Sequence, residues 1–173
     1  MTSKTVLSLG FVLLSATAAL AQRAGPTKVV HDFYSFSNAR SAIFNRQHIE
    51  SRKRWYTREL YRLFLDELRE QTDFLKQHPD EKPFFGDGLD FRPLPEPCQA
   101  NGKEYNRSQR IFRTDVNDNS AYVDIEFAYP EPCTEEPVYY RVRLQRVNGS
   151  WLIDDWIYSD GTTLTRDMKE NRN

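Results

Sequence analysis

The strongest constraint on the fold is a change of hydrophobic period near Gln109, after which apolar and polar residues alternate. Alternation at a period of two is typical of β-strands that bury one face. It predicts four strands, over 110–116, 121–127, 138–145 and 151–158. Each strand is short enough to belong to one antiparallel meander.

The dipeptide Asn148-Gly149 predicts a tight hairpin between the third and fourth strands, because both residues tolerate positive φ angles. A two-residue turn places Arg143 opposite Asp154 as a cross-strand ion pair. The same register places Asp155 opposite Val142, on the apolar inner face of the sheet. A β-bulge at Asp154 and Asp155 would reverse the direction of the second carboxylate.

Two segments with helical spacing come before the strands. Apolar residues recur at intervals of one, three and four over 29–36 and over 60–75. Thr57 fits the N-cap of the second helix, and His78-Pro79 ends it. A short terminal helix or turn is expected within 160–169. Helices followed by an antiparallel meander predict an α+β fold, with N-terminal helices packed on a curved sheet of about four strands.

Residues 79–108 are rich in proline and glycine, which excludes long regular elements there. Phe84, Phe85 and Phe91 lie in this stretch, so we expect the loop to pack against the core. Gly86-Asp87-Gly88 is too short for a phosphate-binding loop and is expected to form a turn.

The first 21 residues have the composition of a secretory signal peptide. Lys4 precedes a short apolar run, and Ala19-Leu20-Ala21 is a small-x-small cleavage motif. The apolar run is shorter than the roughly 20 residues of a membrane-spanning helix, and the sequence contains no second candidate span. We therefore expect cleavage after Ala21, a secreted or periplasmic location, and a single domain over 22–173.

Cys98 and Cys133 are the only cysteines, and each ends the same Pro-Glu-Pro-Cys phrase. In an oxidising compartment an even pair predicts a disulfide. Closing this loop would stabilise the fold by about 4 kcal/mol in the chain-entropy model. A redox pair would favour Cys-x-x-Cys spacing, and a zinc site needs more thiol or imidazole ligands than lie nearby.

The composition narrows the possible functions. The chain has 24 Lys and Arg against 25 Asp and Glu, which argues against a general nucleic-acid-binding protein. No cofactor or metal motif stands out, so neither is expected. Residues 115–126 approach the ligand spacing of a calcium-binding EF-hand loop, but Ser120 stands where glycine is needed. A polar hairpin turn is therefore preferred there.

The stretch 151–158, with Asp160-Gly161-Thr162-Thr163-Leu164 after it, resembles the ending of the domain-of-unknown-function family 3828. The segments 29–36, 60–68 and 85–88 also fit the layout of that family. The resemblance implies a secreted or lipid-anchored bacterial protein with a nuclear-transport-factor-two-like fold. In that fold, helices pack into a curved antiparallel sheet that forms a cone with an inner cavity. The family has no established activity.

Asp155 is the catalytic candidate, because burial on an apolar face would raise its pKa and suit it to act as a general base. The alternative is that Asp155 pairs with an arginine from a helix or loop, or points to solvent past a bulge. Further candidates would bind a partner, either on the outer face of the sheet or in a basic and aromatic cluster after the first helix. These candidates are Trp156, Tyr158, Tyr139, Tyr122, Arg54 and Trp55.

The sequence favours a non-enzymatic binding or interaction protein of the cell envelope, which uses a cone cavity or the sheet face. Its partner would be an unknown protein or small ligand, with no cofactor and no nucleic acid. The first alternative is a small-molecule enzyme with Asp155 as general base. The second is an immunity-type protein that blocks a toxin through the acidic loop 131–136.

Overall fold

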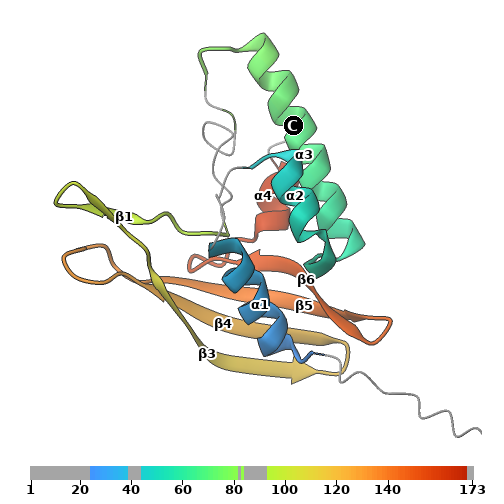
Figure 1. Cartoon of the computed structure of the whole chain (residues 1–173). Coiled ribbons are helices and arrows are strands. Elements are labelled where there is room, and N and C mark those ends of the chain that lie inside the picture. The colour runs from blue at the N-terminus through green and yellow to red at the C-terminus, as the bar shows by residue number, and fades with distance from the viewer. Residues whose placement is uncertain (1–23, 39–43, 82, 84–92, 171–173) are drawn as a thin grey trace, which may run out of the picture.

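The computed structural model describes residues 24–38, 44–81, 83 and 93–170 (Figure 1). The helices are α1 (Pro26–Asn38), α2 (Arg46–Arg52), the short 3-10 helix η1 (Lys53–Trp55), α3 (Arg58–Gln77) and α4 (Leu164–Glu170). The strands are β1 (Cys98–Ala100), β2 (Lys103–Tyr105), β3 (Ser108–Asn117), β4 (Ser120–Ala128), β5 (Val138–Val147) and β6 (Ser150–Ile157). The expected signal peptide over 1–21 lies outside the described residues, as do Phe84, Phe85, Phe91 and Gly86-Asp87-Gly88.

The main layer is an antiparallel sheet in the order β3-β4-β5-β6, and β1 and β2 form a separate small hairpin. Helices α1, α2 and α3 precede this sheet, so the predicted α+β fold is confirmed. All four predicted strands are present. Figure 1 shows α1 lying across the sheet, with α3 rising away from it. The β1–β2 hairpin lies within the stretch 79–108 and escaped sequence analysis because each strand has only three residues.

Two tight turns set the sheet register. Asn148 and Gly149 have φ angles of 49° and 75°, and Val147 lies opposite Ser150, which confirms the predicted hairpin. Asp118 has a φ angle of 38° in the turn between β3 and β4. Residues 115–126 therefore form a strand–turn–strand hairpin, as preferred over a calcium loop.

A β-bulge in β6 changes the predicted register beyond Ile153. Leu144 lies opposite Ile153 as expected, but Arg143 lies opposite Asp155, which makes Asp154 the extra residue. The predicted pairing of Asp155 with Val142 is therefore wrong, because Trp156 takes that position. A bulge places two successive residues opposite one partner, so both carboxylates lie on the same side as Arg143.

The core fills the space between the helices and the inner face of the sheet. Phe33 of α1 lies with its ring centroid 5.0 Å from that of Tyr34 and 5.6 Å from that of Trp156. Phe64 of α3 packs on Tyr56 at 5.1 Å. Fully burying such a side chain contributes about 1.5–3 kcal/mol. Around Trp156 the inner face is therefore a packed aromatic core.

The helix boundaries follow from their capping residues. The Thr57 hydroxyl accepts a hydrogen bond from the Leu60 backbone N–H at 3.2 Å, which confirms the predicted N-cap of α3. Helix α2 was not predicted, and it begins after Asn45, whose side chain accepts from His48 N–H. Arg52 ends α2 and is only 2% exposed, since its Nε donates to the Ser37 hydroxyl at 3.0 Å. Arg52 therefore does not belong to the exposed basic and aromatic cluster that was expected after the first helix.

The predicted disulfide is confirmed. Cys98 in β1 is bonded to Cys133 in the loop between β4 and β5. The bond joins the small hairpin to one end of the main sheet. In the described parts of the chain, no helix is both long and apolar enough to cross a membrane.

Candidate functional site: the outer face of the sheet

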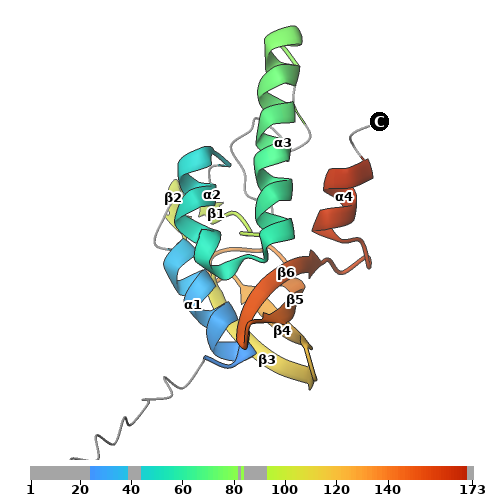
Figure 2. The ribbon, with the colours of Figure 1, turned by 90° about the vertical axis from the view of Figure 1, so that its right-hand side faces the viewer.

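The face of β3, β4 and β5 that points away from α1 is called the outer face here. Figure 2 shows α4 beside β6 on this side, while the described helices leave β3 and β4 open. The alternation of side chains along the strands determines which residues lie on this face. They are Arg110, Phe112, Arg113 and Asp115 from β3, Tyr122, Asp124 and Glu126 from β4, and Tyr139, Arg141 and Arg143 from β5.

A groove of about 380 Å³ runs from the outer face to the end of β6, where Ile157, Tyr158 and Ser159 line it. Phe112 and Tyr139 form its aromatic part and are 51% and 46% exposed. Their rings meet edge to face with centroids 6.3 Å apart, which is a favourable aromatic geometry. Phe112 lies in β3 and Tyr139 in β5, so the pair spans the intervening strand β4 and forms an exposed apolar patch, a feature typical of interaction sites.

Ion pairs hold the charged side chains around this groove. Arg141 donates from Nε and a terminal nitrogen to the two carboxylate oxygens of Asp124, at 2.6 and 2.9 Å. Such two-point pairing fixes the orientation of both groups. Arg110 of β3 forms an ion pair with Glu126 of β4, and Arg113 forms one with Asp115 on the same strand. The aromatic patch is thus bordered by ion pairs whose opposite charges largely cancel.

Asp155 lies on the outer side of β6, beneath α4, rather than on the inner face as expected. Its carboxylate is 1% exposed and accepts from the backbone N–H groups of Trp156 and Thr165, at 2.9 and 3.0 Å. It also accepts from the Thr165 hydroxyl, and Arg143 lies 3.5 Å away. Because these groups occupy both oxygen atoms, the geometry gives Asp155 a structural role as an anchor for α4.

The carboxylate of the neighbouring Asp154 also accepts several hydrogen bonds. It accepts from the Thr57 hydroxyl at 3.1 Å, from Arg143 Nε at 2.9 Å and from Gln145 Nε2 at 3.1 Å. The predicted ion pair between Arg143 and Asp154 is therefore present, although the bulge has changed the register. Asp154 connects the start of α3 to the sheet.

The predicted binding residues divide into two groups. Tyr139 and Tyr122 lie on the outer face, in β5 and β4 as expected. Trp156 is fully buried, and its Nε1 donates to the Tyr34 hydroxyl at 2.9 Å, so its expected exposure on the outer face is wrong. The bulge explains this difference, because it turns Trp156 inward. Tyr158 is half-buried, with its ring 5.6 Å from that of Tyr140 at the end of the sheet.

The second predicted cluster is also partly internal. Trp55 is buried in the core and covered by the guanidinium of Arg54, which lies 3.9 Å from the indole centroid. Arg54 itself remains exposed, and it also faces the ring of Phe36 at 5.2 Å. This cation–π stack shields the edge of the core.

Phe112 was missed as a site residue. A second register shift, between Ile111 and Arg113, makes Phe112 an extra residue in β3 and leaves it exposed. The adjacent apolar residues Ile111 and Phe112 interrupt the alternation of polar and apolar positions. That interruption was the signal in the sequence that could have indicated the bulge.

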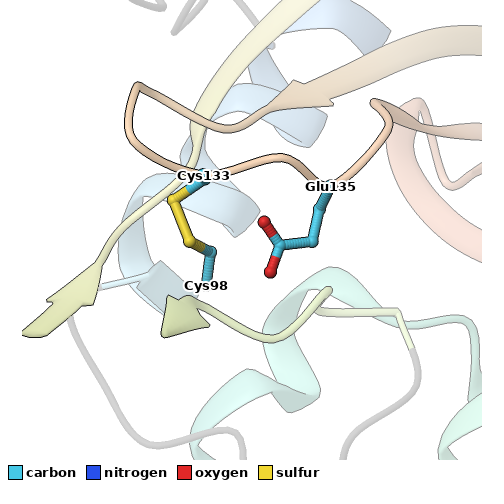
Figure 3. Close-up of side chains that lie close together, drawn as sticks. All are labelled: Cys98, Cys133 and Glu135. Atoms are coloured by element: carbon cyan, nitrogen blue, oxygen red, sulfur yellow. A yellow bond between two sulfur atoms is a disulfide. The ribbon is translucent and has the colours of Figure 1, made fainter. Parts of the chain in front are cut away.

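Cys98, Cys133 and Glu135 form the one group of potential metal ligands in the searched, described residues (Figure 3). Their donor atoms lie within 4.8 Å of one another. The two sulfur atoms are bonded to each other, so in this state neither is the thiolate that binds a metal ion. The acidic loop around Glu135 is exposed.

The fold and site define a disulfide-bonded α+β domain with an open aromatic sheet face. Searches of protein-family models, of curated proteins and of solved structures find no match to this chain. The resemblance to family 3828 and to the nuclear-transport-factor-two-like fold therefore stays a prediction.

Proposed function

We propose that this protein is a secreted or periplasmic binding protein that holds a protein partner on the outer face of its sheet. The observation that carries the proposal is the exposed pair Phe112 and Tyr139, set in a groove between oriented ion pairs. Aromatic and arginine side chains are enriched in the centres of protein interfaces. They also supply most of the binding energy there.

The shape of the groove favours a protein over an enclosed small molecule. Its volume of about 380 Å³ lies at the low end of ligand pockets, and it opens along the sheet instead of surrounding a ligand. One or two side chains of a partner would fill it. Because Arg113 and Arg141 are paired with carboxylates, we expect binding to depend only weakly on salt.

The compartment is part of the proposal. The disulfide between Cys98 and Cys133 is compatible with an oxidising environment. The composition of residues 1–21 supports export by a signal peptide. Membership of family 3828 is proposed on the short motifs that the chain shares with it.

Site-specific photo-crosslinking tests the proposal. A photoreactive phenylalanine analogue would replace Phe112 or Tyr139 in the producing cells, and Phe74 on α3 serves as the matched control position. We expect one discrete protein adduct from the two outer-face positions, with mass spectrometry identifying the partner. Adducts of equal yield from Phe74, or none from the outer face, would contradict the proposal.

Binding between this protein and the identified partner, both purified, then allows a quantitative test. Tyr139→Ala removes an anchor at the centre of the patch, where truncation commonly costs about 2 kcal/mol. We expect the dissociation constant to rise roughly 30-fold, measured by calorimetry. Tyr61→Ala on α3 should leave it unchanged. A similar loss for both variants would indicate a general effect on folding instead of an interface.

The two other functions gain no support from the geometry. Asp155 is enclosed by Thr165, Trp156 and Arg143, which leaves little access for a substrate. The acidic loop 131–136 is exposed, and its residues do not line the groove on the outer face. Neither is proposed here.

A further inference from the structure

Strand β3 is an edge strand, and no other described strand pairs with its outer edge (Figure 1). A free edge presents unpaired backbone N–H and C=O groups that can template pairing with another chain. Two of the most exposed large apolar side chains lie on this strand, Phe112 at 51% and Val116 at 58%. A long edge strand with exposed apolar residues tends to pair with another chain unless something covers or interrupts it.

The register shows which backbone groups face outward. In antiparallel pairs, opposite residues alternate between hydrogen-bonded and non-hydrogen-bonded pairs. The two-residue turn after β3 closes on the pair Asn117 and Ser120, which is hydrogen-bonded. Following the alternation along β4, the residues of β3 in non-hydrogen-bonded pairs direct their N–H and C=O groups away from the sheet. They are Val116, Thr114, Ile111 and Gln109.

The set of outward residues stays symmetric despite the bulge, because the bulge lies at its centre. Without the extra residue Phe112, the outward positions would follow every second residue along the whole strand. With it, they are still arranged symmetrically about the bond between Phe112 and Arg113. A strand with this pattern can pair with a copy of itself, because every outward residue then faces another outward residue.

We propose that a second copy of this chain pairs antiparallel with β3, joining the two sheets edge to edge. In this register Thr114 lies opposite Ile111 of the second copy, and Val116 lies opposite Gln109. Arg110 lies opposite Asp115 of the second copy, so opposite charges meet beside the existing Arg110–Glu126 and Arg113–Asp115 pairs, and the two-fold axis repeats this arrangement. The inner and outer faces of both sheets stay aligned, because each pair joins residues from the same face.

A groove beside the edge provides space for the exposed valine. It lies between α1 and β3, has a volume of about 510 Å³ and is lined by Thr27, Lys28, His31, Gln109 and Ile111. The Thr27 and Thr114 hydroxyls are 2.9 Å apart, which holds the start of α1 beside the strand. Val116 of the second copy points to this inner side next to Gln109 and would enter the groove.

This inference does not depend on the proposed partner on the outer face. Pairing through β3 would place the Phe112 side chains of both copies near the two-fold axis. The two outer faces would then form one continuous surface with a groove on each half. A partner protein could bind either to one half or across both.

Sedimentation velocity of residues 22–173 over a range of micromolar concentrations tests the dimer. We expect a concentration-dependent dimer for the unaltered chain and a monomer for Val116→Lys, which places a charge in the apolar groove. Val147→Lys is the matched control, since Val147 is also an exposed valine, at the other hairpin. It should leave the dimer intact.

Thr114→Pro provides a second variant. It removes an outward N–H without removing a hydrogen bond to β4, so the sheet tolerates it while the dimer does not. Circular dichroism confirms that each variant is folded. Amide hydrogen exchange checks the register, since the amides of 109, 111, 114 and 116 should exchange more slowly in the dimer than in Val116→Lys. A monomer at all concentrations, or a dimer that neither folded variant weakens, overturns the proposal.

Discussion

At the scale of single residues, Tyr34 shows how a polar atom is accommodated in an aromatic core. Its hydroxyl accepts a hydrogen bond from Trp156 Nε1, and both side chains are fully buried. Burial raises the pKa of the Tyr34 phenol well above its usual value, because the charged form would lose its hydration. The Tyr34 phenol therefore stays neutral in the folded protein at alkaline pH values where it would ionise in the unfolded chain.

We predict that Tyr34→Phe destabilises the protein by about 1–3 kcal/mol at neutral pH, because it removes the buried hydroxyl that accepts from Trp156 Nε1. The pH dependence follows from the raised pKa. Below pH ~10 the phenol is neutral in both states, and above it only the unfolded state ionises, so stability falls by about 1.4 kcal/mol per pH unit for each such tyrosine. Urea unfolding between neutral and alkaline pH measures both effects.

In Tyr34→Phe the alkaline loss of stability should be less steep by the contribution of one tyrosine. Tyr56 is also buried with a raised pKa, so part of the slope remains. Tyr122→Phe on the outer face is the control and should change stability by less than about 0.5 kcal/mol. An unchanged alkaline slope in Tyr34→Phe would show that Tyr34 is not protected in the folded state.

At the scale of elements, the bulge in β6 determines how α4 is attached. Because Asp154 is the extra residue, Asp155 points toward the outer side and meets the first turn of α4. Its carboxylate accepts the Thr165 backbone N–H, one of the groups at a helix start that lack a partner within the helix. Helix α4 has only seven residues and would be marginal without this contact.

We predict that Asp155→Asn loosens α4 and lowers the free energy of unfolding by roughly 2 kcal/mol. The amide keeps the size of the side chain but replaces one buried acceptor by a donor that faces Arg143 or Thr165. Chemical denaturation measures the loss, and amide exchange over 164–170 should become faster. Asp118→Asn in the exposed turn is the control, since asparagine tolerates its positive φ angle. Unchanged protection of α4 would contradict the anchoring role.

At the scale of the whole molecule, the disulfide connects the small hairpin to the main sheet. Cys98 belongs to the β1–β2 hairpin, and Cys133 to the loop between β4 and β5, 35 residues later. A cross-link over such a loop acts mainly by restricting the unfolded chain.

We predict that replacing both Cys98 and Cys133 by alanine lowers stability by about 4 kcal/mol, with a lower figure expected where the reduced chain keeps residual structure. For a chain of this size the melting temperature should fall by about 10 °C. Differential scanning calorimetry measures the change. Glu135→Gln, which leaves the bond intact beside it, should melt like the unaltered chain. An equal melting temperature for the alanine variant would show that the bond does not support the fold.

The sequence by itself determined the α+β class, the four strands of the main sheet, the Asn148-Gly149 hairpin, the Thr57 cap and the cysteine pairing. Each of these depends on residues close together in the chain or on a choice among very few partners. The hydrophobic period and the turn residues carry that information directly.

Only the tertiary structure decided which way the residues after each bulge point. One extra residue in a strand reverses the face of every side chain that follows, so Asp155 and Trp156 exchange their expected sides. Phe112 became exposed, and Arg52 became buried against Ser37, for reasons that involve partners distant in the chain. The sequence marks where a bulge can form, at Ile111-Phe112 and at Asp154-Asp155, but packing between elements decides whether it forms.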